Sequence, residues 1–193
     1  MAGELDSATK VSVPRVGVYQ RYYGGNADEG WTNLLLEQFG FPYSTLMDDI
    51  IKGGELNESY DIIIIPNDPE AMITGEGLEE YMMSRSQPLP NFPPEYKSGL
   101  GSEGVKALKE YVKNGGRLVC LNQSCEFAIH AFDLKVRNVL NDLNRKEFFC
   151  PGSTIHVKID PLRPIGYGMP LEGLVFFWDG LAFEILPSEY NDK

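Results

Sequence analysis

The sequence predicts an α/β fold with a mostly parallel central sheet between layers of helices, a flavodoxin-like or Rossmann-like three-layer sandwich. The segment YDIIIIPN holds four consecutive isoleucines. A continuous apolar run of this kind, unlike an alternating one, is typical of a central strand covered on both faces. Units of strand, helix and strand then repeat along the chain, and right-handed crossovers between parallel strands produce the layered architecture.

One globular domain is expected. With 193 residues and 42% hydrophobic content, the chain is long enough for one proper core and short for two. We assign residues 1–14 to an N-terminal tail or linker and residues 15–193 to the domain.

The first half of the chain predicts strand, helix, strand and a brief helix. RVGVYQ is a short β-branched run after Pro14, and Trp31, Leu34, Leu35 and Phe39 then share one face of a helix. Asp28 is the expected cap of that helix and Gly40 its stop. PYSTLMD predicts a second strand, and DDIIKGGEL a brief helix or turn.

The long connection from Asp68 to Gly101 is rich in Pro, Gly, Met and Ser. Such a connection is typical of a lid, a binding loop or a partner surface, and a surface insertion without chemistry is the alternative. A helix from Ser102 to the Gly115-Gly116 pair then leads into the strand RLVCLN and the helix SCEFAIHAFD.

The last third predicts a different kind of structure. VRNVLNDLNRKEFFC favours a short helix and a loop, whereas GSTIHVKID alternates like an edge or antiparallel strand. GLVFFWDGLAFEIL predicts one or two more strands.

Charge and hydropathy exclude two classes of partner. The formal net charge is -11 and no cluster of Lys and Arg occurs, which argues against a nucleic-acid surface. No apolar stretch approaches the roughly 20 residues of a membrane helix, and MAGELDSATK has no apolar signal core. We expect the chain as given to be soluble; its compartment stays open.

Three cysteines, Cys120, Cys125 and Cys150, have neither CxxC nor Cys/His metal spacing. We therefore expect no disulfide framework, no metal site and no cofactor.

Residues that follow two predicted parallel strands are the candidates for a functional site, because the crevice of such sheets lies beyond the carboxyl ends of the strands. Asn67 and Asp68 follow one strand, and Asp28 and Glu29 start the first helix near the same edge. These four are the binding candidates. The catalytic candidates follow RLVCLN, where a strand turns at once into a helix: Ser124, Cys125 and Glu126.

The shape of RLVCLNQSCEF is that of a nucleophile elbow, yet structural roles explain the same residues. The elbow pattern G-x-S-x-G needs small flanking residues, and Ser124 is flanked by Asn122 and Glu126. Ser124 also suits a helix cap, and Cys125 a small buried position. The two histidines, His130 and His156, stand on a helix and in an alternating strand, neither well placed to act as base.

Nearly the whole chain resembles a known family. From about Arg15 to Glu184 the following strings occur in order: DEGWTNLLLEQFGFPY, YDIIIIPN, PPEYKSGLGSEGVKALKEYVKNGGRLVCLN, LKVRNVL, EFFCPGS and PIGYGMP. Together they resemble the class I glutamine amidotransferase-like domain found C-terminal to a zinc carboxypeptidase domain in bacterial carboxypeptidase A-like metallopeptidases. The resemblance implies a flavodoxin-like fold, a peptidase domain or a second copy as partner, and a parent family that is often secreted.

The sequence departs from that family where its chemistry would lie. Ser124 falls about where active amidotransferases carry the cysteine of G-x-C-x-G, and no H-x-E pattern follows. The zinc ligands of the peptidase domain are absent, and the family's domain continues past the Phe183-Glu184 match into a further strand and helix. The resemblance thus implies a degenerate member, and we expect a domain truncated at its C-terminus.

Three functions follow as hypotheses. The first is a non-catalytic binding or accessory module for a small molecule, a peptide or a companion peptidase domain. The alternative is a hydrolase or amidotransferase that uses Ser124 or Cys125 as nucleophile, assisted by Glu126. The third is self-association through the aromatic segment GLVFFWDGLAF.

Overall fold

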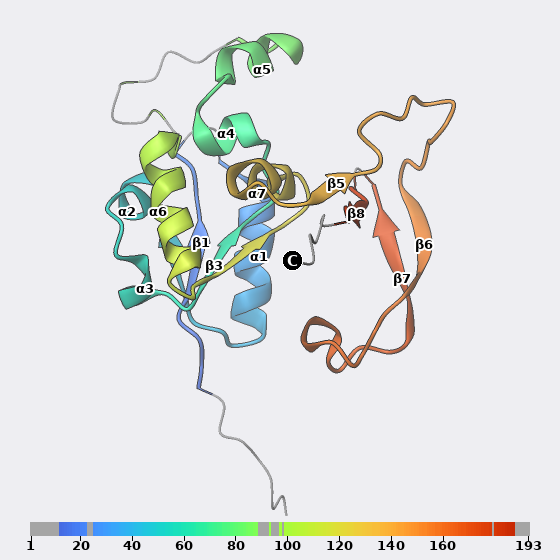
Figure 1. The fold of residues 1–193 in the computed structure, drawn as a ribbon, viewed down its shortest axis with the longest axis horizontal. Helices are drawn as coiled ribbons and strands as arrows, with labels where there is room; N and C mark the ends of the chain where they lie inside the picture. The colour runs from blue at the N-terminus through green and yellow to red at the C-terminus, as the bar shows by residue number, and fades with distance from the viewer. Residues whose placement is uncertain are drawn as a thin grey trace, which may run out of the picture. The chain divides into compact units, whose positions relative to one another are not determined.

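The protein was analysed as a computed structural model, which describes residues 12–22, 25–88, 93, 97, 99–178 and 180–187. The chain divides into two compact units, residues 1–134 and 135–193 (Figure 1), and each is described by itself. Most of the predicted tail at residues 1–14 lies outside the described residues.

The first unit is built on a four-stranded, wholly parallel sheet with the strand order β2-β1-β3-β4. Its strands are β1 (Val16–Tyr19), β2 (Tyr43–Leu46), β3 (Ile62–Ile65) and β4 (Arg117–Cys120). The order is that of flavodoxin-like sheets, so the predicted α/β fold is confirmed. The isoleucine run forms the interior strand β3, as its pattern indicated.

Seven helices of the described residues accompany this sheet: α1 (Ala27–Gln38), α2 (Asp48–Lys52), α3 (Leu56–Ser59), α4 (Glu70–Thr74), α5 (Leu78–Ser84), α6 (Gly101–Lys113) and α7 (Ser124–Phe132). The connection from β1 to β2 runs in one direction along the sheet, and the connections to β3 and β4 run in the other. Right-handed crossovers therefore place α1 on one face and α2, α3 and α6 on the opposite face (Figure 1).

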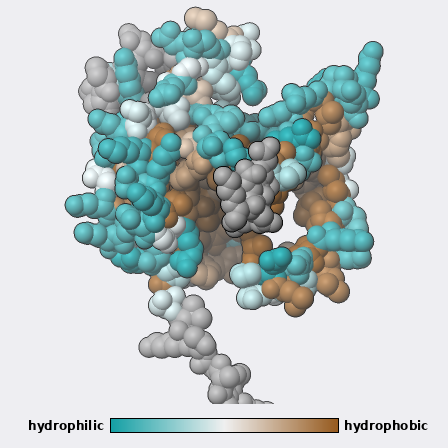
Figure 2. Space-filling model, viewed as in Figure 1, coloured by the Kyte–Doolittle hydropathy of each residue, from teal (hydrophilic) through white to brown (hydrophobic). Residues whose placement is uncertain are grey.

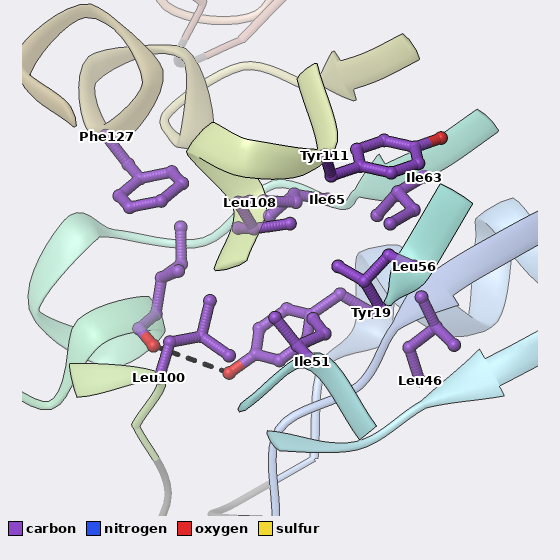
Figure 3. Close-up of a cluster of buried hydrophobic side chains, with 11 residues drawn as sticks. Tyr19, Leu46, Ile51, Leu56, Ile63, Ile65, Leu100, Leu108, Tyr111 and Phe127 are labelled. Carbon is purple, nitrogen blue, oxygen red and sulfur yellow. Dashed lines mark hydrogen bonds between the residues drawn. The ribbon is translucent and has the colours of Figure 1, made fainter. Parts of the chain in front are cut away.

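The hydrophobic core lies on the face covered by α2, α3 and α6 (Figure 3). Ile63 and Ile65 of β3 are fully buried there against Leu108 of α6 and Phe127 of α7. Alternate residues of β3 point to this face because side chains alternate along a strand. Ile62 and Ile64, on the other face, are only half-buried.

Helix α1 is confirmed, but its cap and its apolar face differ from a standard core helix. The cap is Asn26, whose side chain accepts a hydrogen bond from the backbone N–H of Asp28, so the prediction of Asp28 as cap is wrong. The apolar face faces outward: Trp31 is 65% exposed and Phe39 75%. Isolated exposed side chains are ordinary, whereas an exposed apolar helix face is a candidate interaction surface.

The long connection expected after β3 begins with two helices, α4 and α5. Its return to α6 is fixed by buried polar contacts. Asp48, 1% exposed, accepts hydrogen bonds from the Tyr19 hydroxyl (2.7 Å) and the Gly99 N–H (2.8 Å). Gly99 has φ 135, and a Cβ there would lie 2.7 Å from the Thr74 carbonyl oxygen, so the close approach requires glycine.

The second unit contains two antiparallel pairs of strands. β5 (Val136–Asn138) pairs with β8 (Phe183–Ile185), and β6 (Ser153–Lys158) pairs with β7 (Glu172–Phe177); a 3-10 turn covers Pro164–Gly166. The strands predicted in GSTIHVKID and GLVFFWDGLAFEIL are thus confirmed. Hydrophobic side chains, brown in Figure 2, gather along the hairpin of β6 and β7 and the loop that joins them.

The short helix predicted within VRNVLNDLNRKEFFC is wrong, because the segment opens as β5 and continues in turns. The side-chain oxygen of Asn138 accepts from the Leu140 N–H, and that of Asn144 accepts from the Lys146 N–H. Asparagine side chains that bond the backbone two residues on stabilise turns at the expense of helix.

No helix in the described part of the chain has the length and apolar character needed to span a membrane.

Candidate functional site at the carboxyl edge of the sheet

The strand order reverses between β1 and β3, and ligands of flavodoxin-like folds bind at the carboxyl edge of such a switch point. The segments that leave the two strands there begin at Gln20 and Pro66. Polar side chains from these two segments and from the start of α1, together with a backbone N–H of the turn after β4, form one hydrogen-bonded network. Three of the four predicted binding residues lie in it: Asn67 and Asp68 after β3, and Asp28 in α1.

A buried ion pair joins the two strands at this edge. Arg21, after β1, approaches Asp68, after β3, with Nε 2.5 Å from Oδ2, and the side chains are only 10% and 5% exposed. Burial raises the pKa of the Asp68 carboxyl, while the hydrogen bond and the charge of Arg21 oppose that rise. The charges of Arg21 and Asp68 are therefore buried where water solvates them poorly.

The side-chain amides of Asn26 and Asn67 and the backbone N–H of Gln123 extend the network. Asn26 Nδ2 donates to the Asn67 carbonyl oxygen (3.1 Å) and lies 3.4 Å from Asp68 Oδ2. Asn67 Nδ2 donates to Asp28 Oδ2 (3.2 Å), and Asn67 Oδ1 accepts from the Gln123 N–H (3.1 Å). Asn67 thus links the ends of β3 and β4 to α1, which fixes the geometry of the edge.

Glu29, the fourth predicted binding residue, stands apart from these contacts. It is 7% exposed on α1, and Asn33 Nδ2 of the next turn donates to its Oε1. The structure therefore brings Asn67, Asp68 and Asp28 together, whereas Glu29 pairs within its own helix.

The turn after β4 has the geometry of an elbow, and its turning residue is Asn122. Asn122 has φ 51, in the left-handed region that few residues other than glycine enter, with asparagine among the more tolerant. The residues two positions before and after it are Cys120 and Ser124, both small. Counted from the turning residue, the small-x-x-x-small flanks of an elbow are present, and a carboxamide stands where an elbow carries its nucleophile.

Ser124 is a structural residue of this turn. It is fully buried, its Oγ donates toward the carbonyl oxygens of Ile65 (3.0 Å) and Leu121 (2.9 Å), and it accepts from the Leu121 N–H (2.8 Å). These contacts tie the start of α7 to β3. A nucleophile must meet both a substrate and a base, and this hydroxyl is directed to backbone groups instead.

The neighbouring thiols are not activated. Cys125 is half-buried with its Sγ 3.2 Å from the Cys120 carbonyl oxygen, and burial, followed by the charge of Glu126, raises its pKa. Burial raises the pKa of Cys120 to about 12. A helix N-terminus lowers the pKa of an exposed thiol, but desolvation outweighs that effect at Cys125.

Both histidines engage carboxylates away from the elbow residues. His130 Nδ1 lies 2.7 Å from Glu70 Oε2, at the start of α4, and His156 Nε2 lies 3.3 Å from Glu172 Oε2 across the β6–β7 pair. The catalytic roles predicted for Ser124, Cys125 and Glu126 thus stay predictions, and the side-chain contacts of Ser124 and Cys125 described above are to backbone groups.

Within the described ranges, no group of three or more His, Cys, Asp or Glu side chains could hold a metal ion. The site offers amide, carboxylate and guanidinium groups, which suit hydrogen bonding to a polar ligand.

Sequence reasoning missed four residues of this edge: Arg21, Asn26, Asn122 and Gln123. Arg21 and Asn26 follow the first strand and Asn122 and Gln123 follow β4, so the rule that located Asn67 and Asp68 applied equally to them. Asn122 carried a further signal, since asparagine is enriched where a turn needs positive φ.

Comparison with known proteins identifies no family. No family model matches the chain, and no curated protein does. Among solved structures the chain is similar to a ThuA-like protein from Bacteroides uniformis, at 12% identity and a TM-score of 0.46, over 92% of this chain and 63% of that chain. The chain thus spans less than two thirds of that protein's length. A similarity this weak supports no argument about function, and the fold assignment rests on the sheet itself.

Proposed function

We propose that this chain is a non-catalytic, glutamine amidotransferase-like module that binds a small polar ligand at the carboxyl edge of β1, β3 and β4. The observation that carries the proposal is the elbow after β4, where the turning residue is the carboxamide of Asn122. An amide is not a nucleophile, and the adjacent Ser124 is buried in backbone hydrogen bonds. The alternative is a hydrolase at Ser124 or Cys125, whose side chains contact backbone carbonyl groups among the described residues.

The polar network supports a binding role. Asn67 and Asp28 present an amide and a carboxylate side by side, 3.2 Å apart, at a switch point where such folds hold ligands. Asp28 is exposed, so its oxygens are accessible as acceptors. Because the groups are fixed by hydrogen bonds to the ends of β3 and β4, they are ordered before any ligand arrives, which lowers the entropic cost of binding.

The elbow is tested by placing a thiol on it. In Asn122→Cys, the introduced thiol would stand at the turning residue just before α7, where a helix N-terminus lowers a thiol pKa, and residue 122 is as partly exposed as Cys125. We expect iodoacetamide at pH 7 to alkylate it faster than the native Cys125, as measured by peptide mass spectrometry.

The matched control is Ser124→Cys, whose side chain replaces a fully buried hydroxyl. Circular dichroism first verifies that both variants are folded. A protected thiol in Ser124→Cys beside a reactive one in Asn122→Cys supports the elbow assignment. A thiol that reacts faster in Ser124→Cys than in Asn122→Cys would place the reactive position at residue 124 and favour the enzyme hypothesis.

Ligand binding is tested by thermal shift against monosaccharides, free amino acids and dipeptides. A compound that binds at this edge stabilises the wild type and loses most of its effect in Asn67→Ala. Glu70→Gln, on the exposed pair with His130, serves as the control and retains the effect. A panel without any stabilising compound, or a shift that survives Asn67→Ala, would contradict the proposed site.

For a partner we propose a zinc carboxypeptidase domain. Two features support this: the ordered motif resemblance, and the outward apolar face of α1, where Trp31 and Phe39 lie near the acidic Asp28 and Glu37. A second copy of the chain is the other occupant of that face to consider. Light scattering of the wild type and of Trp31→Ser/Phe39→Ser separates them, because only self-association is visible in the isolated chain.

A further inference from the structure

We propose that the second unit carries a separate binding pocket for a small aromatic carboxylate, with Arg145 as the anion-binding residue. The pocket lies between the connection from β5 to β6 and the end of β7, and its volume is about 380 Å³. Ligand pockets commonly measure about 300–1,000 Å³, so this one suits a single small molecule. Its lining comprises Asn138, Leu140, Asn141, Leu143, Arg145, Phe148, Phe149, Cys150, Pro151, Phe177, Trp178, Gly180 and Leu181.

Aromatic side chains form the walls. Phe148 meets Phe177 edge to face, with ring centroids 6.1 Å apart, and Trp178 lines the same pocket while 71% exposed. Exposed aromatic faces around a hollow favour a planar apolar group, since stacked and edge-to-face rings attract each other beyond the area that they bury. The walls therefore select a ring.

Arg145 supplies the charge. Its guanidinium carbon lies 5.2 Å from the centroid of the Phe149 ring, so the ring supports one face of the guanidinium. Among the described residues no carboxylate pairs with Arg145, and the nearby Glu147 accepts hydrogen bonds from Asn144 instead. A stacked guanidinium keeps its edge of N–H donors available, and that edge matches a carboxylate.

Hydrogen bonds of Asn138 also stabilise the backbone turn beside the pocket. Asn138, 7% exposed, donates to Asn141 Oδ1 (2.7 Å) and accepts from the Leu140 N–H (3.1 Å), which fixes the turn that leads toward Arg145. Electrostatics do not oppose an anion here. Residues 135–193 contain seven Lys and Arg against eight Asp and Glu, so the chain's net charge of -11 resides almost wholly in the first unit.

A ring and a carboxylate a few bonds apart occur in free arylalkanoic acids and at the C-terminus of a peptide that ends in phenylalanine. The probes are 3-phenylpropionate, 3-phenylpropionamide, and a tripeptide ending in Phe as free acid and as amide. Binding is followed by the fluorescence of Trp178 in a Trp31→Phe background, because these are the two tryptophans of the chain.

We expect 3-phenylpropionate to bind at least tenfold more tightly than its amide. Arg145→Gln should reduce the affinity for the acid by about 10- to 100-fold, the range of hydrogen bonds to charged groups. Arg163→Gln, which removes an exposed arginine of the same unit outside the pocket, should leave it unchanged. Stronger binding of the tripeptide acid would identify a peptide terminus as the source, and stronger binding of the free acid a metabolite.

Equal affinities for acid and amide would overturn the proposal, as would an undiminished affinity in Arg145→Gln. Absence of any fluorescence change at millimolar 3-phenylpropionate would do the same. None of these three outcomes depends on the site at the sheet edge. Failure of this inference is therefore distinguishable from failure of the proposed function.

Discussion

Two arginine–aspartate pairs join the same two strands, one at each end of the sheet. Arg15 and Asp61 precede β1 and β3, and their side chains are 48% and 39% exposed. Arg21 and Asp68 follow the same strands and are 10% and 5% exposed. Hydrogen bonds from Arg15 lower the pKa of Asp61 to about 2, whereas burial raises the pKa of Asp68.

The difference shows that water solvates the two ion pairs to very different extents. At the amino end the bidentate pair sits in water and stabilises the ionised aspartate, as an ordinary surface contact does. At the carboxyl end the charges are removed from water at a cost that their attraction only partly offsets. The buried pair fixes the orientation of the polar groups around it, as the binding edge that we propose requires.

The largest expected effect separates the two ends directly. Arg21→Met leaves Asp68 buried without its partner, and we expect a loss of about 3–5 kcal/mol in the free energy of unfolding. Arg15→Met removes an exposed partner and should cost far less. Urea unfolding of both variants at pH 7 measures the contrast, and equal losses would show that the pairs are equivalent.

A double variant tests whether the buried Arg21–Asp68 pair can be replaced by apolar side chains. Because a buried ion pair can often be replaced by apolar side chains without loss, Arg21→Met/Asp68→Leu should recover most of the stability that Arg21→Met loses. The same urea experiment provides the measurement. A double variant as unstable as Arg21→Met would mean that the network needs the carboxylate itself.

The pH dependence of stability should have opposite signs at the two ends. The lowered pKa of Asp61 contributes stability above about pH 3.8, its unfolded value, which is lost as the pH falls toward 2. The raised pKa of Asp68 contributes stability below pH 3.8, which is lost as the pH rises through its folded value. Urea midpoints of the wild type, Asp61→Asn and Asp68→Asn between pH 2 and 7 test both signs; parallel profiles would contradict them.

The smallest expected effect is that of salt. At 1 M NaCl the Debye length is about 3 Å, so the advantage of the wild type over Asp61→Asn at pH 7 should shrink. The difference between the wild type and Arg21→Met should change less, because solvent ions do not reach that pair. Repeating the urea series in 1 M NaCl provides the check, and equal salt sensitivity would oppose the assigned burial.

The sequence predicted the sheet because its strands are runs of β-branched residues with clear ends. Ile62–Ile65 and Arg117–Cys120 follow this rule, and parallel pairing then followed from the helices between them. The turns were harder. Asn26 rather than Asp28 caps α1, and either residue type suits that position.

The elbow shows why the site could be predicted only in part. The strand-to-helix turn was located correctly, but the sequence alone favoured Ser124 as its centre. Which residue takes φ 51 depends on where β4 stops pairing with β3, and that register is a tertiary property. The exposure of the apolar face of α1 could not be predicted from the sequence either. Helical periodicity identifies an apolar face but does not show what covers it.

Covalent labelling of the wild type tests whether the elbow carries a reactive nucleophile. The folded protein is treated with a fluorophosphonate and with iodoacetamide, and Ser124, Cys125 and Asn122 are assayed by peptide mass spectrometry beside Ser124→Ala and Cys125→Ala. We expect no fluorophosphonate adduct, and we expect Cys125 to be alkylated no faster than an unactivated thiol. Rapid, stoichiometric labelling of Ser124 or Cys125 that the matching alanine variant abolishes would contradict it and establish an enzyme.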